Sequence, residues 1–166
     1  MGSFPHEMSG YRHVSEDATR AMFEALWGRQ LDEEPGLRIP NMMDAAVDGS
    51  FKGLYIQGED ILQSDPNTQH MAAGLAAMEC VVVQDLFLVE TANYAHVFLP
   101  GSTFLEKTGT FTNAERRIQM VRKVMTPKNG YEDWQITCLL SNALGYPMNY
   151  NNPSEIMDEI AALTPT

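Results

Sequence analysis

The run CVVVQD, residues 80–85, constrains the fold most, because three consecutive valines suit a β-strand that is covered on both faces. A β-prone run lies on either side of it, FKGLYIQG before and HVFLPG after. Helical segments separate these runs: DPNTQHMAAGLAAMEC has apolar residues at helical spacing, and VETANYA predicts a shorter helical piece. This alternation is typical of parallel sheets with helices on their faces. The sequence therefore predicts an α/β fold of three layers with a mainly parallel sheet.

The remaining segments predict further helices and one more strand. Residues 15–27 and the segment IPNMMDAAVDG predict helices before the sheet, each followed by a glycine. After the third β-prone run, a long loop rich in Thr, Gly and Asn leads into a strand within ERRIQMVRK. The tail predicts two C-terminal helices, over residues 132–145 and 152–163.

Length and composition indicate one domain with a substantial core. The chain has 166 residues, of which 44% are hydrophobic and 20% charged, so it can bury a core and is not disordered. We expect a single domain over 1–166, made of a lead-in helix and linker (1–36), an α/β cofactor-binding core (37–150) and a C-terminal helix (151–166).

Charge and hydropathy argue against two classes of partner. The formal net charge is −11, and such a field repels nucleic acid at long range. The basic residues of ERRIQMVRK predict a solvated face rather than a nucleic-acid site. No apolar run approaches the roughly 18 residues of a membrane span. We therefore expect neither a nucleic acid nor a membrane as partner.

The cysteines and histidines predict no metal site. Cys80 and Cys138 lie far apart in apolar company, the usual setting of inert buried thiols, and this fits a reducing, cytoplasmic location. The four histidines show neither an i, i+4 pair nor an HExxH arrangement.

Unusual residues follow each of the three β-prone runs. These runs end in Gly58-Glu59-Asp60, in Gln84-Asp85 and in Pro100-Gly101-Ser102. In open parallel sheets, ligands bind at the carboxyl ends of the strands. A carboxylate can accept two N–H bonds from a guanine edge or bind a ribose diol, and a glycine lets a ring or phosphate approach the backbone. The strand ends predict a nucleotide-like ligand; the alternative is that these residues simply form turns.

Nothing in the sequence proposes a catalyst on its own. A Rossmann GxGxxG motif and a Walker P-loop are both absent, and no Ser/His/Asp or Cys/His order stands out. We therefore assign no catalytic residue and no metal ligand in this chain.

Four segments carry a resemblance to a known family. GEDILQSD, VVVQDLFLVETANYAHVFLPG, FLEKTGTFTNAERRIQMVRK and DWQITCLLSNALGYPMNYN resemble a middle portion of the catalytic (alpha) subunit of formate dehydrogenase. That subunit is a molybdopterin oxidoreductase that binds bis(molybdopterin guanine dinucleotide) at molybdenum or tungsten. The resemblance covers essentially the whole chain and implies a fragment of a much longer subunit, whose iron–sulfur domains and metal-ligating cysteine or selenocysteine lie upstream.

The resemblance implies an activity for the whole enzyme and partners for the fragment. The full enzyme is expected to oxidise formate to carbon dioxide and pass two electrons through iron–sulfur clusters toward NAD. The fragment is expected to be inactive and to bind no cofactor alone. Its partners would be the rest of the catalytic subunit and the electron-transfer subunits. Similar signatures recur in nitrate reductases, so another molybdopterin oxidoreductase stays open as an alternative, as does a free-standing α/β nucleotide-binding module.

The resemblance also implies which residues hold the guanosine and pyrophosphate of one pterin dinucleotide. It implies that Gly58 and Asp60 lie at the guanine end of the nucleotide pocket. It also implies that an acidic residue just before Trp134 closes the same pocket. Some relatives carry a serine where this chain has Gly101, so only the backbone there or the neighbouring Ser102 would contribute. The expected cofactor-binding residues are Gly58, Asp60, Ser64, Gln84, Asp85, Gly101 and Asp133.

Overall fold

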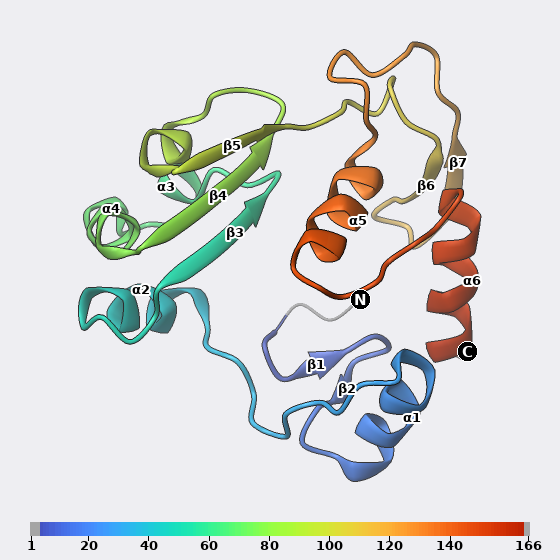
Figure 1. Ribbon diagram of the computed structural model, residues 1–166, viewed down its shortest axis with the longest axis horizontal. Helices are drawn as coiled ribbons and strands as arrows, with labels where there is room; N and C mark the ends of the chain where they lie inside the picture. Colours follow the sequence, from blue (N-terminus) through green and yellow to red (C-terminus); the bar gives the residue numbers. More distant parts are fainter. Residues whose placement is uncertain (1–3, 165–166) are drawn as a thin grey trace. The chain divides into compact units, whose positions relative to one another are not determined.

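A computed structural model describes residues 4–164 of the chain, shown as a ribbon in Figure 1. The backbone contacts divide the chain into two compact units. One unit joins the residues up to Met42 with those from Ser154 onward, and the other is the continuous segment Met43–Pro153. The expectation of one domain over the whole chain remains a prediction. No helix in the described part of the chain is long and apolar enough to cross a membrane.

A three-stranded parallel sheet forms the centre of the second unit. Its strands are β3 (Gly53–Gln57), β4 (Cys80–Asp85) and β5 (Val97–Pro100), in that spatial order. Gln57 lies opposite Gln84, and Asp85 lies opposite Pro100. The carboxyl ends of all three strands therefore meet at one edge, as the sequence predicts for this α/β fold.

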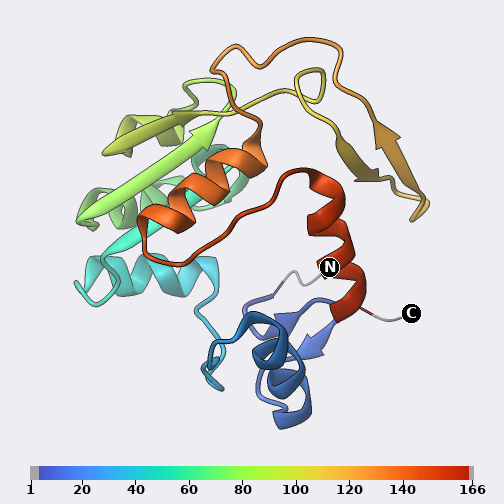
Figure 2. The same ribbon diagram turned by 45° about the vertical axis from the view of Figure 1, so that its right-hand side comes forward.

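Helices cover both faces of this sheet (Figure 2). On one face, Ile56, Val81 and Val83 belong to a buried apolar core shared with the helices α2, α3 and α4. The other face is covered by α5. The bounds of these helices are α2 Ile39–Val47, of which Met43–Val47 belong to this unit, α3 Ile61–Ser64, α4 Thr68–Ala77, the 3₁₀ helix η1 Glu90–Tyr94 and α5 Asp133–Ala143. This arrangement confirms the three-layer prediction, although α3 was not predicted separately.

Capping explains where two of these helices begin. The side chain of Asn67 accepts the backbone N–H of His70 at 3.2 Å and so caps α4. At α5, the Glu132 side chain and Gln135 form a reciprocal capping box, in which Gln135 Oε1 accepts the Glu132 N–H at 2.8 Å. The second cap fixes the start of α5, and therefore the position of Asp133, its first residue.

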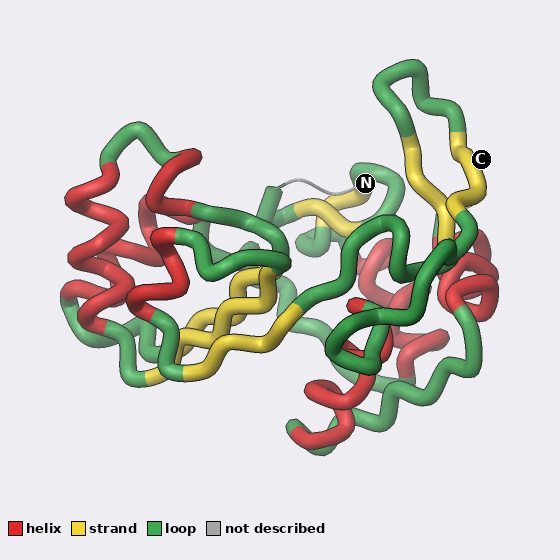
Figure 3. Tube along the Cα trace, turned by 90° about the horizontal axis from the view of Figure 1, so that it is seen from above, coloured by secondary structure: helices red, strands yellow, loops and turns green. Residues whose placement is uncertain are grey.

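The segment after β5 contains a β-hairpin where the sequence predicts a loop and one strand. Strands β6 (Gly109–Thr112) and β7 (Ile118–Val121) pair antiparallel, and the hairpin extends away from the parallel sheet in Figure 3. The threonine-rich stretch assigned to the loop supplies β6, because β-branched threonine is well suited to a strand once a partner is present.

The first unit is built from two pieces of the chain that are far apart in sequence. It contains β1 (Glu7–Met8), β2 (Arg12–His13), α1 (Asp17–Trp27) and most of α6 (Pro153–Leu163). Arg12 hydrogen-bonds the Leu163 carbonyl, and Trp27 Nε1 donates to Glu159 at 2.8 Å. These contacts hold α6 against α1 and against the amino-terminal hairpin, whose short strands the sequence did not predict.

One expectation about the cysteines is wrong. Cys138 is buried on α5, as expected, but Cys80 is exposed. Cys80 is the first residue of β4, whereas the next residue, Val81, faces the core. Alternation along the strand therefore separates these neighbours despite their similar sequence surroundings.

Candidate functional site

A cavity of about 380 Å³ lies at the carboxyl ends of the parallel strands. Residues that follow β3, β4 and β5 contribute to its wall, together with the first residue of α5 and a lysine from the loop before β6. The lining residues are Gln57, Gly58, Gln84, Asp85, Leu86, Gly101, Ser102, Lys107 and Asp133. Five of the seven residues predicted for the site are therefore brought together here: Gly58, Gln84, Asp85, Gly101 and Asp133.

Backbone hydrogen bonds continue past the strand ends and shape this cavity. The N–H of Gly58 donates to the Gln84 carbonyl at 2.8 Å, and the N–H of Gly101 donates to the Asp85 carbonyl at 2.8 Å. Gly58 turns the chain away from the sheet at a φ of 64°, a left-handed conformation that favours glycine. The three strand ends therefore form a fixed rim rather than three loose loops.

A chain of side-chain hydrogen bonds runs behind the cavity. The Tyr55 hydroxyl donates to Gln84 Oε1, and Gln84 Nε2 donates to Asp133 Oδ1 at 2.9 Å. Lys107 Nζ forms an ion pair with Asp133 Oδ2. Gln84 is only 1% exposed, so its carboxamide belongs to the interior and links the sheet to α5.

Asp133 is the centre of this network. Its Oδ1 also accepts the Ser102 N–H at 3.0 Å, while the Ser102 hydroxyl accepts the Asp133 N–H at 3.1 Å. Burial raises the pKa of the Asp133 carboxyl, but hydrogen bonds from Lys107, Ser102 and Gln84 outweigh burial and leave that pKa below its usual value. Asp133 is therefore ionised at neutral pH, and both of its carboxylate oxygens accept hydrogen bonds from other residues of the protein.

Asp85 keeps an oxygen available for a ligand. Its Oδ1 accepts the N–H of Leu86 at 2.6 Å and that of Phe87 at 3.4 Å. Within the described residues, Oδ2 receives no hydrogen bond. Asp85 is half-buried at the rim. Its carboxylate is thus oriented by the following turn while one acceptor remains free to receive donors from a bound molecule.

Gly101 lies at a narrow point of the rim. A Cβ atom at this position would lie 3.1 Å from Asp133 Oδ1 and 3.4 Å from the Asp85 carbonyl oxygen. A Cβ atom there would be in tight contact with Asp133, which would have to shift by a few tenths of an ångström.

Two predicted site residues do not line the cavity. The Asp60 carboxylate accepts the Thr91 hydroxyl at 2.6 Å and the backbone N–H groups of Thr91 and Glu90, both at 3.2 Å. Burial raises the pKa of Asp60, but these hydrogen bonds outweigh it and leave the pKa lowered. Ser64, at the end of α3, hydrogen-bonds Glu59. Both side chains hydrogen-bond nearby segments outside the cavity, and their assignment to the cofactor site remains a prediction.

Sequence reasoning missed Lys107 as part of the site. Lys107 lies in the segment FLEKTGTFTNAERR, which contributes to the family resemblance. The sequence predicts a long loop there, and a lysine in a loop does not indicate which acidic residue it pairs with. Its ion pair with Asp133 spans 26 residues, and only the folded chain brings the two together.

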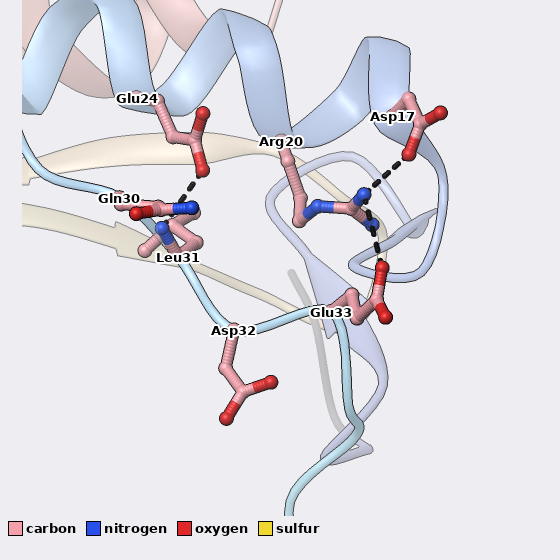
Figure 4. A pocket seen from close by; sticks show the side chains of 7 residues that line it. All are labelled: Asp17, Arg20, Glu24, Gln30, Leu31, Asp32 and Glu33. Atoms are coloured by element: carbon pink, nitrogen blue, oxygen red, sulfur yellow. Dashed lines mark hydrogen bonds and ion pairs between the residues drawn. The ribbon is translucent and has the colours of Figure 1, made fainter.

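A larger cavity of about 730 Å³ lies in the first unit and is shown in Figure 4. Its wall is acidic, but Arg20 pairs with Asp17 and lies 3.6 Å from Glu33 Oε2. Glu24 Oε1 accepts the Leu31 N–H at 2.8 Å. Its carboxylates therefore largely hold the loop after α1 in place. Within residues 4–164, no group of three or more His, Cys, Asp or Glu side chains could hold a metal ion.

Comparisons with known proteins identify the family. A family model described as molybdopterin oxidoreductase matches residues 2–143. The chain is 45% identical to a protein of Staphylococcus haemolyticus and 42% identical to one of Bacillus subtilis, both named "putative formate dehydrogenase"; the matches cover 100% and 99% of this chain and 17% of each relative. An acetylene hydratase from Pelobacter acetylenicus shares the fold, with a TM-score of 0.67 and 19% identity over 90% of this chain and 22% of that one. The chain, which spans about a sixth of the length of these curated relatives, belongs to the molybdopterin oxidoreductase family.

Proposed function

We propose that the cavity at the strand ends holds the guanosine end of a molybdopterin guanine dinucleotide in the catalytic subunit of a formate dehydrogenase. The observation that carries this proposal is the convergence of three strand ends on one rim, whose lining includes Asp85 with its Oδ1 held by the Leu86 N–H. A carboxylate oxygen at that place can accept N–H groups from the edge of a guanine. Family membership supports a molybdopterin cofactor with molybdenum or tungsten.

The residues present fit the nucleotide end of such a cofactor. The cavity of about 380 Å³ lies within the usual range of small-molecule sites, which starts at roughly 300 Å³. Gly101 lies in the cavity wall, packed closely against Asp133 and the Asp85 backbone. Asp85 supplies an acceptor, and the glycine-bearing turns bring backbone close to the ligand. These residues would bind and orient the nucleotide, while the bound metal centre supplies the redox chemistry.

Formate is the substrate that the relatives' names favour. We further propose carbon dioxide as the product and NAD as the final electron acceptor of the whole enzyme. We propose a cytoplasmic location for the protein. Its proposed partners are the remainder of the catalytic subunit and the electron-transfer subunits. Exposed apolar side chains beside the cavity support additional covering structure: Phe87 is 72% exposed and Leu88 79%. A free-standing module would carry less apolar surface at that position.

Titration with GDP, followed by amide chemical shifts, tests the nucleotide assignment. We expect weak binding, with shifts concentrated at Gly58, Asp85 and Gly101. ADP should bind more weakly, because adenine lacks the N1–H and 2-amino donors that Asp85 would accept. Shift changes confined to surfaces remote from this rim would contradict the assignment.

The variant Asp85→Asn tests the proposed acceptor directly. We expect GDP affinity to fall by about tenfold to a hundredfold, since a hydrogen bond to a charged group contributes roughly 1.5–3 kcal/mol. Asp32→Asn is a matched control, because Asp32 also accepts a following backbone N–H, at 3.0 Å from Glu34, but lies outside the cavity. Equal effects of the two substitutions would count against a guanine-reading role for Asp85.

A further inference from the structure

Lys107 directs its ammonium group toward the protein rather than into open solvent. Its Nζ donates to the Ser102 carbonyl at 3.1 Å and pairs with Asp133 Oδ2. The side chain of Lys107 is 27% exposed and that of Asp133 is 19% exposed. An ammonium group has three donors, so two of them are already used by the wall of the cavity.

The ion pair stabilises a carboxylate on which several other groups depend. Asp133 Oδ1 receives Gln84 Nε2 at 2.9 Å and the Ser102 N–H at 3.0 Å. Removing the cation would leave a mostly buried carboxylate without its charged partner, which is costly. The carboxylate would then protonate or move toward water, and either change weakens the bonds that hold Gln84 and Ser102.

Those two residues belong to different parts of the rim. Gln84 lies near the end of β4 and is fixed on its other side by Tyr55. Ser102 follows Gly101, at the end of β5. Both line the cavity. A displacement of Asp133 would therefore be transmitted to two strand ends at once.

We propose that Lys107 is a positioning residue for the cavity: it holds Asp133, and through Asp133 it holds Gln84 and Ser102 in the arrangement that receives the base. This inference rests on the proposed function for the identity of the ligand. The hydrogen bonds that link Lys107, Asp133, Gln84 and Ser102 do not depend on that identity. A direct role, in which Lys107 binds a phosphate group of the ligand, predicts a different pattern of affinities.

Comparison of guanosine with GDP separates these two roles. A positioning residue affects the part of the cavity that binds the base, which guanosine and GDP share. Lys107→Met should therefore lower the affinity for both ligands by the same factor, on the order of tenfold if one hydrogen bond to a charged group is lost. A phosphate-binding lysine would weaken GDP alone. Lys52→Met is the matched control, because Lys52 forms a 2.7 Å ion pair with Glu79 away from the cavity. It should leave both affinities unchanged.

A spectroscopic measurement without ligand tests the network itself. The side-chain NH₂ signals of Gln84 should shift and broaden in Lys107→Met, should change less in Lys107→Arg, which keeps the charge, and should stay unchanged in Lys52→Met. If Lys107→Met does not fold, the same measurements are made on Lys107→Arg. We then expect a smaller shift of the Gln84 signals and a partly retained affinity for both guanosine and GDP.

Each outcome decides one of the two proposals. Unchanged Gln84 signals in the Lys107 variants, or a loss of affinity limited to GDP, would overturn the positioning role. Failure of the unmodified chain to bind either guanosine or GDP would instead overturn the proposed function, while the Gln84 signals would still decide the role of Lys107.

Discussion

The carboxylate of Asp60 accepts the hydroxyl of Thr91 at 2.6 Å and the backbone N–H of the same residue at 3.2 Å. Asp60 immediately precedes α3, and Thr91 lies in η1, so the two hydrogen bonds join segments that are 31 residues apart. Thr91 Oγ1 also accepts the N–H of Leu62 at 3.2 Å. Asp60 therefore joins α3 to η1.

Replacement of Thr91 by valine should destabilise the protein. Thr91 is fully buried, and valine keeps the shape while removing the hydroxyl that serves both Asp60 and the Leu62 N–H. We expect a loss of about 1–3 kcal/mol in the free energy of unfolding, because buried polar groups lose a partner. Urea denaturation followed by circular dichroism measures this change. Thr112→Val, at an exposed position of β6, is the control and should change stability by less than about 0.5 kcal/mol.

Replacement of Gly74 by alanine should also destabilise the protein, although alanine favours helices. A Cβ atom at Gly74 would lie 2.5 Å from Met43 Sδ and 3.0 Å from Met43 Cα, so the backbones of α4 and α2 would have to separate. Overpacking of this kind costs roughly 1–3 kcal/mol, more than the helix propensity gained. Thermal unfolding compares Gly74→Ala with Gly109→Ala, where no atom lies within 4 Å of the added Cβ. A Gly74→Ala protein as stable as the parent would show that the two helices do not approach this closely.

The lowered pKa of Asp133 makes stability depend on pH in a defined direction. A carboxyl group whose pKa is lower in the folded state binds more protons when the chain is unfolded. Its contribution to the free energy of unfolding is therefore fully present above the unfolded pKa, about 4, and is lost as pH falls through the folded pKa. Asp133→Asn removes this contribution. We expect the variant to be less stable than the parent at pH 7 and the two stability curves to converge on acidification. Urea midpoints measured between about pH 2 and 7 test this; parallel curves would contradict it.

The two cysteines should differ in reactivity. Cys80 is exposed at the start of β4, whereas Cys138 is 9% exposed on α5. A thiol reagent such as iodoacetamide should therefore modify Cys80 in the native chain and reach Cys138 only after denaturation. Mass spectrometry of the labelled peptides measures both sites. In Cys80→Ser, native labelling should fall nearly to zero; persistent labelling at Cys138 would indicate that α5 opens readily.

Local patterns account for most of the secondary structure. The valine run predicted β4, helical spacing predicted α4, and the glycine that closes IPNMMDAAVDG predicted the end of α2 to within two residues. Strand β6 was missed because a threonine-rich segment becomes a strand only when β7 lies beside it. The exposure of Cys80 was missed for a similar reason, since its neighbours in sequence are apolar but its own side chain is exposed at the start of β4.

The amino-acid sequence by itself determined the parallel sheet, the longer helices around it and the family, because these depend on short-range periodicity and on motifs that are continuous in the chain. Only the tertiary structure decided which polar residues meet. Asp60 turned inward to Thr91, whereas Lys107 reached Asp133 and Asp133 reached Gln84 across 26 and 49 residues. Hydrogen bonds and ion pairs act over a few ångströms, so their partners are chosen by the packing of the folded chain and not by distance along it.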